Sequence, residues 1–240
     1  MKKVFLGLLV ALMVFSFCAV SYAEETVKQQ EQQLKIVPEE QTILDAEKVF
    51  QQINNVVEMG IPRGLVYAAQ AIAIFPKTQG GGLIIGGMSG KGVILYKNPE
   101  TNKWSAPAFL KIGGASIGFQ AGVHEVDIVL LVMDKNSVEG LLQSRFKLGV
   151  DGGIAIGPAG RDADIGADLQ AKSIIYSYSR SRGAYIGLKL QGTTIWPNSA
   201  ANEAVYGKPY DTKQIIVENV VKPTVAGEQL IQVIEKYTKK

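Results

Sequence analysis

Apolar residues recur at helical spacing at both ends of the chain. After residue 38 they return every three or four positions, which predicts an amphipathic helix that ends near Gly60. The apolar face of this helix consists of Ile43, Ala46, Phe50, Ile53 and Val57. A second, short helix is expected from about Pro62, leading into an apolar strand before Pro76. From Pro223 onward the same spacing predicts an amphipathic C-terminal helix with a lysine-rich end.

The centre of the chain has a different pattern. Between Gly80 and about Ile195, short apolar runs rich in β-branched residues and glycine alternate with turn signals, which is typical of strands. The expected strands are residues 82–87, 92–97, 107–113, 116–123, 126–133, 147–156, 163–172, 174–179 and 184–191. In the run VDIVLLV, apolar residues occur among the side chains that would point to each of the two faces of a strand. The strand is therefore expected to be covered on both faces. The pattern predicts an α+β fold, with N-terminal and C-terminal helices packed on a largely antiparallel, strongly bent sheet of about eight or nine strands.

The first 23 residues have the composition of a secretory signal peptide. MKK supplies positive charge, an apolar run follows to about residue 20, and the small-residue frame SYA precedes two glutamates. We expect cleavage after Ala23, a flexible leader over residues 24–37 and a single folded domain over residues 38–240. An uncleaved membrane anchor is the alternative interpretation of the same run.

Removal of this segment changes the charge and the cysteine content. The remaining chain has 23 basic and 22 acidic residues, so its net charge is +1 with His124 neutral. This balance gives no indication of a nucleic-acid partner. The single cysteine, Cys18, lies in the removed segment, and Phe17 precedes it where a lipid-modified cysteine would need a small residue. The mature chain is therefore expected to have no lipid anchor, disulfide or thiolate metal site.

The stretch GGGLIIGGMSGKG, residues 80–92, is the first candidate for chemistry. A phosphate-binding loop would need a glycine five residues before Gly90, a hydroxyl residue after the lysine and a helix afterwards. Ile85 and Gly92 occupy the first two of these positions, and a β pattern follows. We therefore predict that the glycines shape strands, because glycine in strands marks bulges, bends or close backbone approach.

Acidic residues and the histidine are further candidates. RDADIGAD contains Asp162, Asp164 and Asp168, but its glycine comes too early for a calcium loop and no glutamate closes it. His124 has no second histidine for a metal site and no G-x-S-x-G serine for a hydrolase. Enzyme chemistry would have to rest on carboxylates alone. We predict a non-catalytic protein that holds no metal and no cofactor.

Arginines beside aromatic residues have the most suitable chemistry for a ligand. Arg180 and Arg182 follow two tyrosines in YSYSRSRG, and Arg145 and Lys147 flank Phe146. Guanidinium groups bind phosphate oxygens through paired donors. Solvated residues at strand ends are the alternative interpretation of the same positions.

Several motifs, taken together, resemble the SYLF domain family. They are WSAP at 104–107, FQAG at 119–122, GPAGR at 157–161, YSYSRSRG at 176–183 and NEAVYG at 202–207. The resemblance covers about residues 61–207 and implies binding of membrane phospholipids, often anionic ones, without catalysis. Among the matching positions, Arg161, Arg180 and Arg182 are the residues able to hold a lipid phosphate. The matching aromatic residues and glycines are expected to be structural.

This chain departs from the family in two respects. The family includes yeast regulators of cortical actin, which act in the cytoplasm, so the expected export argues against actin as a partner. Lipid binding in other members is linked to a basic amphipathic helix at the start of the domain. The corresponding helix here has one lysine, Lys48, against five acidic residues: Glu39, Glu40, Asp45, Glu47 and Glu58.

The sequence thus leads to a hypothesis and an alternative. We expect an exported phospholipid-binding protein of a bacterial cell envelope, periplasmic and membrane-associated, that engages lipid headgroups or a membrane face. The alternative is a structural or protein-interaction module of the envelope that binds an envelope protein and no lipid.

Overall fold

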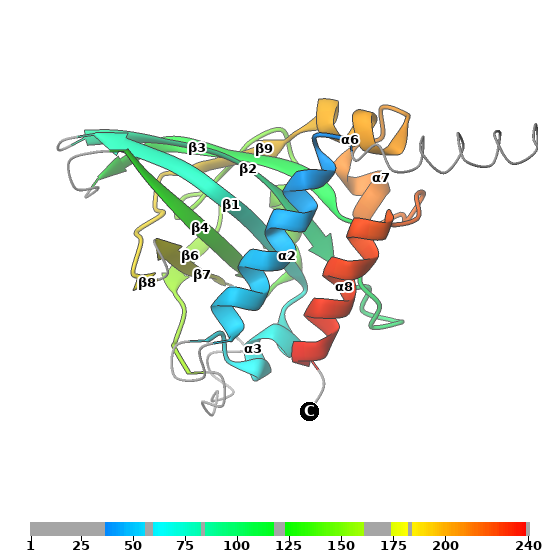
Figure 1. The fold of residues 1–240 in the computed structure, drawn as a ribbon, viewed down its shortest axis with the longest axis horizontal. Helices are drawn as coiled ribbons and strands as arrows, with labels where there is room; N and C mark the ends of the chain where they lie inside the picture. The colour runs from blue at the N-terminus through cyan, green and yellow to red at the C-terminus, as the bar shows by residue number, and fades with distance from the viewer. Residues whose placement is uncertain are drawn as a thin grey trace, which may run out of the picture. The chain divides into compact units, whose positions relative to one another are not determined.

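The centre of the protein is a strongly curled sheet, drawn in Figure 1 of the computed structural model. The structure describes residues 37–55, 60–82, 85–117, 123–160, 174–181 and 184–238. Within them the strands are β1 (Ala71–Gly82), β2 (Ile85–Tyr96), β3 (Ala108–Ile117), β4 (Val123–Val132), β5 (Phe146–Lys147), β6 (Gly153–Ile156), β7 (Ile174–Ser181), β8 (Ala184–Ile186) and β9 (Thr194–Pro197). They lie in the order β5-β9-β3-β2-β1-β4-β7-β6, with β8 also paired to β7. Every described pair is antiparallel except β6 with β7, which confirms the expected sheet.

Helices cover both faces of this sheet. They are α2 (Glu40–Asn54), α3 (Arg63–Ala68), α4 (Lys135–Leu141), α6 (Ser199–Tyr206), α7 (Thr212–Ile216) and α8 (Val225–Thr238). α2 and α8 lie side by side (Figure 1), and Phe50 meets Tyr237 edge to face with ring centroids 5.8 Å apart. The N-terminal and C-terminal helices predicted from apolar spacing are thereby confirmed. None of the described helices is long and apolar enough to cross a membrane.

Two apolar layers, one on each face of the sheet, form the core. β4 contributes to both, because Val129 and Leu131 pack under α2 and α8 while Ile128 and Leu130 point to the other face. The second layer is closed by α4, by α7 and by Phe146 of β5. The prediction that VDIVLLV forms a strand covered on both faces is confirmed, because an apolar layer packs against each face of β4.

Glycines in β2 accommodate a bulge in β1. The register of β1 shifts against β2 between Ile74 and Gln79, and Lys77 in this bulge has a positive φ of 48°. A Cβ on Gly92 would lie 2.3 Å from the carbonyl oxygen of Ile74, and one on Gly90 would lie 2.6 Å from the Thr78 hydroxyl. The prediction that these glycines shape strands is confirmed, since the bulged backbone of β1 approaches β2 where a side chain would stand.

Several strand boundaries differ from those expected. β2 and β3 continue through their glycines, where the pattern predicted breaks near residues 88–91 and 114–115, because ladder hydrogen bonds hold glycine in extended form. The single strand expected over 147–156 is divided into β5 and β6. The strand expected over 184–191 ends at Ile186, because β6 pairs with β7 beyond that point. The strand expected over 163–172 lies outside the described residues.

Candidate functional site

Arg180 is held inside the protein by two partners. It lies near the end of β7, directly opposite Asp127 of β4, and its Nη2 donates to Asp127 Oδ2 at 3.1 Å. The same nitrogen donates to Gln52 Oε1 on α2. The Arg180 side chain is 18% exposed. Through Gln52 and Asp127, its guanidinium connects α2 to the sheet. The other two predicted phosphate ligands, Arg161 and Arg182, lie outside the described residues.

The carboxylate that binds Arg180 also holds the bulge of β1. Asp127 Oδ1 accepts a hydrogen bond from the backbone N–H of Lys77 at 3.0 Å. The Lys77 ammonium in turn pairs with Asp45 Oδ2 of α2 at 2.7 Å. A non-glycine residue in the left-handed region costs of order 1–3 kcal/mol and persists only where its surroundings hold it. Asp127 and Asp45 provide those surroundings, and they connect α2, β1, β4 and β7.

The ion pair between Lys77 and Asp45 makes stability depend on pH. Burial raises the pKa of Asp45, but hydrogen bonds from Lys77 and Gln41 and the charge of Lys77 outweigh it, so the pKa lies below 3.8. The hydrogen bond to Asp45 raises the pKa of Lys77 above 10.5. A carboxyl group with a lowered folded-state pKa stabilises the fold above its unfolded-state pKa, and this stabilisation is lost as the pH falls through the folded-state value.

We expect Asp45→Asn to lower the free energy of unfolding by about 0.5–1 kcal/mol at neutral pH, because the ammonium of Lys77 is well exposed to solvent. Because the variant has no carboxyl group to protonate at this position, its stability should fall less than that of the parent chain below about pH 4. Urea denaturation between neutral pH and pH 3 measures both effects. Glu139→Gln is the control, since Glu139 pairs with Lys135 at 3.6 Å with both side chains exposed. Equal pH profiles for Asp45→Asn and the parent chain would contradict the assignment.

A second group of residues forms a cationic surface that the sequence did not reveal. Lys91 of β2 is the direct register partner of Lys111 of β3, and Lys111 is the partner of Trp196 of β9. Directly opposite residues of paired strands point to the same side of a sheet. Their neighbours Ile112 and Ile195 belong to the second apolar layer, so these three side chains point to the face that carries α2. We call Gln79, Ser89, Lys91, Lys111 and Trp196 the cationic sheet face.

The position of the indole depends on a glycine. A Cβ on Gly113 would lie 2.9 Å from the Trp196 ring, so the ring occupies the space above this residue of β3. Lys91 and Ser89 are exposed, whereas Lys111 and Trp196 are half-buried. Among the described ion pairs, none involves Lys91 or Lys111. Two positive charges directly opposite each other destabilise a sheet unless an anion lies near them.

A hollow separates this face from α2. It has a volume of about 300 Å³ and is lined by Thr42 and Asp45 of α2, by Pro76, Lys77 and Gln79 of β1, and by Ser89, Gly90 and Lys91 of β2. Lysine ammonium groups and hydroxyls are donors that bind phosphate oxygens. Lys77 and Asp45 neutralise each other in the hollow, so its net positive charge comes from Lys91. The cationic sheet face at the hollow has the chemistry to bind an anion at the surface.

Sequence reasoning missed this face because its residues come from separate strands. The alternation in FLKIGG and in GKGVIL indicates that each lysine points away from its apolar neighbours. Register decides whether the two lysines meet, and the sequence pattern does not specify it here. The sequence therefore indicated the face to which each lysine points, but not that the two lysines lie opposite each other.

The histidine and the aspartates that were candidates for metal binding or catalysis form no described site. His124 lies on β4 opposite Gly80 in the register. Asp162, Asp164 and Asp168 lie outside the described residues. Among the residues that were searched, those with a described placement, no group of three or more His, Cys, Asp or Glu side chains could hold a metal ion.

Aromatic residues and glycines of the recognised motifs have structural contacts. A Cβ on Gly157 would lie 2.2 Å from the Tyr178 ring, and the Tyr178 hydroxyl donates to the carbonyl of Pro158 at 3.1 Å. Trp104 is buried, and the Lys97 ammonium lies 5.7 Å from its ring centroid. The motif residues thus pack the GPAG segment against β7 and the WSAP segment against β2.

The NEAVYG motif attaches α6 to the start of β3. The buried Asn202 accepts a hydrogen bond from the Phe109 backbone N–H at 2.8 Å, and the Tyr206 hydroxyl donates to the Pro107 carbonyl at 2.6 Å. Burial raises the pKa of Tyr206 well above its ordinary value, with a smaller effect from Glu40. Hydrogen bonds of Asn202 and Tyr206 thus hold the NEAVYG motif, and with it α6, against β3.

A curled, largely antiparallel sheet with helices on both faces defines an α+β domain, here with a cationic, partly uncovered surface. The chain belongs to the Ysc84 family, whose model is described as "Las17-binding protein actin regulator" and matches residues 113–237, just over half of the chain. The resemblance to the SYLF domain family is thereby confirmed. The family description refers to binding of another protein and to regulation of actin, not to a chemical reaction.

The relatives that match are longer proteins. "SH3 domain-containing YSC84-like protein 1" of Bos taurus is 28% identical over 181 residues, which cover 75% of this chain and 52% of the relative. The human protein of the same name is 26% identical with the same coverage. "LAS seventeen-binding protein 3" of Saccharomyces cerevisiae is 28% identical over 178 residues, covering 73% of this chain and 38% of the relative. The chain therefore spans about half the length of the animal relatives and less of the yeast protein.

Proposed function

We propose that this protein is an exported, non-catalytic phospholipid-binding protein of a bacterial cell envelope. It acts in the periplasm and binds the phosphate of lipid headgroups at the cationic sheet face. The observation that carries the proposal is the placement of Lys91 directly opposite Lys111, next to Trp196, without a described acidic partner for either lysine. The signal-like N-terminus supports export, and the resemblance to SYLF domains supports a lipid ligand.

A lipid phosphate suits this surface for two physical reasons. An anion between the two ammonium groups replaces their repulsion by two attractive, charge-assisted contacts. An indole beside them suits a membrane surface, because tryptophan is enriched where a bilayer meets water. The hydroxyl of Ser89, one row away on the same face, can donate to the same headgroup.

The three arginines predicted from the sequence have different parts in lipid binding. Arg161 and Arg182 are proposed to contribute charge to headgroup binding. Arg180 has a different part, because its guanidinium is bound to Asp127 and Gln52 and positions α2 beside the cationic sheet face. Arg182→Gln is the informative variant of the three, since it removes a positive charge two residues after Arg180 without replacing the arginine that pairs with Asp127.

We expect Lys91→Gln combined with Lys111→Gln to weaken binding to anionic vesicles by roughly thirtyfold, because each basic residue near such a surface contributes about 1 kcal/mol. The slope of affinity against salt concentration should also become shallower. Sedimentation with vesicles of phosphatidylglycerol and phosphatidylethanolamine at several salt concentrations measures both. The chain is to be expressed at full length and isolated as the cell leaves it, with its N-terminus determined by mass spectrometry.

The matched control is the double variant Lys135→Gln with Lys213→Gln. It removes the same charge from two exposed lysines outside the sheet, Lys135 on α4 and Lys213 on α7, which pair with Glu139 and Glu218. Parent-like vesicle binding is expected for this control. Equal weakening in both double variants would mean that net charge, not the cationic sheet face, governs binding. Absence of binding to every vesicle, including one made from native envelope lipids, would overturn the lipid proposal.

A protein ligand is the second candidate function, and the family supports it. The family description and the name of the yeast relative both refer to binding of a protein. Under this alternative, the cationic sheet face binds an acidic segment of an envelope protein. The vesicle assay separates the two, because the alternative predicts no sedimentation with pure lipid. A signal-peptide cleavage site detected in the isolated chain, together with its recovery from the periplasm, tests the proposed location.

A further inference from the structure

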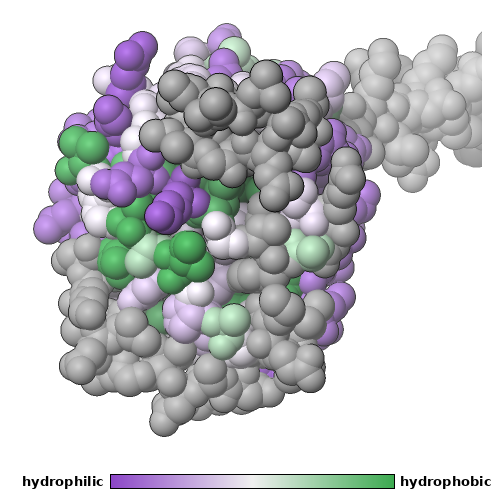
Figure 2. Space-filling view, turned by 90° about the vertical axis from the view of Figure 1, so that its left-hand side faces the viewer, coloured by the Kyte–Doolittle hydropathy of each residue, from purple (hydrophilic) through white to green (hydrophobic). Residues whose placement is uncertain are grey.

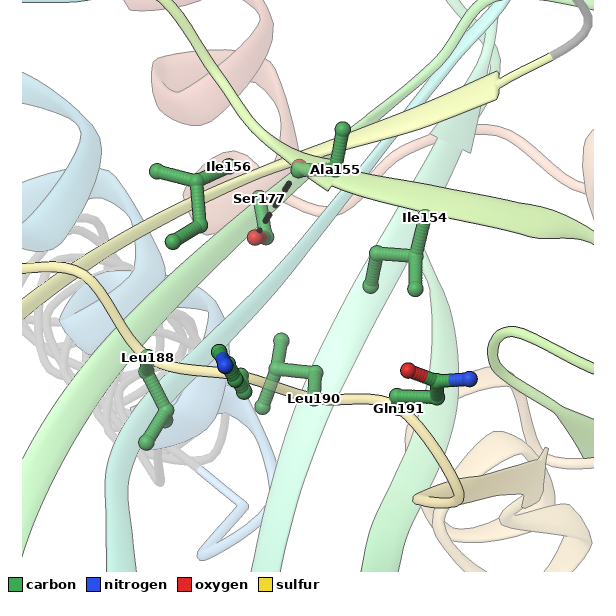
Figure 3. Close-up of a pocket in the computed structure, with 8 residues that line it drawn as sticks. Ile154, Ala155, Ile156, Ser177, Leu188, Leu190 and Gln191 are labelled. Carbon is green, nitrogen blue, oxygen red and sulfur yellow. Dashed lines mark hydrogen bonds between the residues drawn. The ribbon is translucent and has the colours of Figure 1, made fainter. Parts of the chain in front are cut away.

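A second pocket, of about 260 Å³, lies at the β6 edge of the sheet, on the side of the second apolar layer (Figure 3). Its walls come from β6 and from the segment 188–191 that follows β8. Ile154 points from β6 across the gap toward Leu190, whereas Ile156 points toward the Leu188 end of the segment, and the pocket is also lined by Lys189 and Gln191. The larger side chains of both walls are aliphatic, but polar groups of Ser177, Lys189, Gln191 and the backbone contribute at least as much of the pocket surface.

The strand pairing explains why this pocket exists. β8 pairs with β7 from Ser179 to Ser181, whereas β6 occupies the same edge of β7 from Ile174 to Ser177. The chain after Ile186 therefore leaves the sheet and passes over it instead of continuing as a strand. The backbone N–H of Leu188 still donates to the Ser179 hydroxyl at 3.3 Å, and Leu190 is buried in the second apolar layer. Both ends of the segment are fixed, so the space beneath it is preformed.

The aliphatic walls are incompletely covered. Ile156 is 49% exposed, and Ile154 and Leu188 are half-buried. Figure 2 looks onto the side of the molecule that carries β6 and β8, and hydrophobic groups gather there beside hydrophilic ones. Lys189 lies at this pocket, is exposed, and has no ion-pair partner among the described salt bridges. Aliphatic walls next to a free positive charge complement an amphiphile with an anionic head.

The volume sets the size of the apolar part of such a ligand. A dry cavity of about 150 Å³ accommodates one benzene molecule. By proportion, the pocket has room for roughly ten carbon atoms of a chain, which is part of one acyl chain and too little for a whole phospholipid. The rest of the ligand has to remain outside, where Lys189 can meet its charge.

We propose that this pocket binds the first part of one acyl chain of a phospholipid, with the lipid phosphate near Lys189. The inference rests on the proposed function, since it adds a second lipid site, separate from the cationic sheet face, to a protein that binds lipid headgroups. A lipid drawn partly out of a bilayer would place one chain between β6 and the segment 188–191. Its remaining chain and headgroup would stay at the membrane surface.

Binding of single-chain lipids tests the proposal. Monoacyl phosphatidylglycerols with chains of about six to fourteen carbons, kept below their critical micelle concentrations, are titrated into the isolated protein by calorimetry. Affinity is expected to rise about fifteenfold for every two carbons that are fully buried, and then to level off near ten carbons, where the pocket is full. Affinity independent of chain length, or rising without a plateau, would overturn the inference.

Two variants locate the binding. Ile156→Trp fills the pocket from an exposed position and should abolish the dependence on chain length, while Lys189→Gln should weaken every chain length by a similar factor, about fivefold. Val150→Ser is the matched control, because Val150 is 68% exposed and does not line the pocket. Parent-like binding by Ile156→Trp, with its fold verified by circular dichroism, would exclude the pocket.

The two proposals can fail separately. Vesicle sedimentation that depends on Lys91 and Lys111, without any binding of single-chain lipids, would overturn the acyl-chain pocket and leave the headgroup proposal standing. Chain-dependent binding that is unchanged by Ile156→Trp would also overturn the pocket. If neither vesicles nor single-chain lipids bind, both proposals are wrong, and a protein ligand becomes the better account of the protein.

Discussion

Replacing Asp127 by alanine is expected to lower the free energy of unfolding by about 3 kcal/mol, because it leaves a largely buried guanidinium without its counter-charge. Arg180 and Asp127 pair at 3.1 Å with side chains 18% and 19% exposed. The variant also removes the acceptor of the Lys77 backbone N–H, which holds the bulge at its positive φ. Chemical denaturation followed by circular dichroism and tryptophan fluorescence measures the change.

Two further variants show whether the pair or the packing is responsible. Asp127→Asn keeps an oxygen for the N–H of Lys77 but removes the charge, so a smaller loss of about 1–2 kcal/mol is expected. Asp127→Ala combined with Arg180→Met should lose less than the sum of the single variants, since neither charge is left unpaired. Strict additivity, or a loss below 1 kcal/mol for Asp127→Ala, would contradict the role assigned to this carboxylate.

Gly92→Ala is expected to destabilise the protein by about 3 kcal/mol, the upper part of the range for overpacking a core. The added Cβ would lie 2.3 Å from the Ile74 carbonyl oxygen and 2.5 Å from a carbon of the Phe75 ring. The carbonyl belongs to the backbone of β1 next to the bulge, so it cannot move without disturbing the pairing with β2. Equilibrium unfolding in urea measures the loss.

Gly87→Ala in the same strand is the matched control. A Cβ at Gly87 meets no atom within 4 Å, so the change in stability is expected to stay within about 0.5 kcal/mol. A comparable loss in both variants would mean that glycine is required for strand formation in general. A large loss in Gly92→Ala alone would confirm close backbone approach as the reason for glycine at this position.

The elements with strong periodicity were predictable from the sequence. Apolar spacing around Phe50 predicted α2, and the apolar run of β4 indicated a strand buried on both faces, because both patterns follow directly from which sides of an element are covered. Strand ends at glycines were predicted wrongly. Hydrogen bonding by the neighbouring strand decides whether a glycine continues a ladder, and this information is not local.

The candidate site was predictable only in part. The side-chain types that bind phosphate could be named from the sequence, but Arg180 turned out to be bound to Asp127, which is 53 residues away in the chain. The cationic sheet face was not foreseen, since Lys91, Lys111 and Trp196 meet only through the register of three strands. The pocket beside β6 arises from the division of one edge of β7 between two strands, which no local pattern indicates.

The sequence by itself determined the α+β class, the helices at both ends, the family and the strand-shaping use of the glycines in GGGLIIGGMSGKG. These properties follow from local periodicity, from steric limits on single residues and from motif order, all of which are written along the chain. Only the tertiary structure decided which charges are paired, which lie side by side on an uncovered face and where an apolar space remains. Strand order and register bring together residues far apart in the chain, and charge pairing and pocket shape depend on those distances.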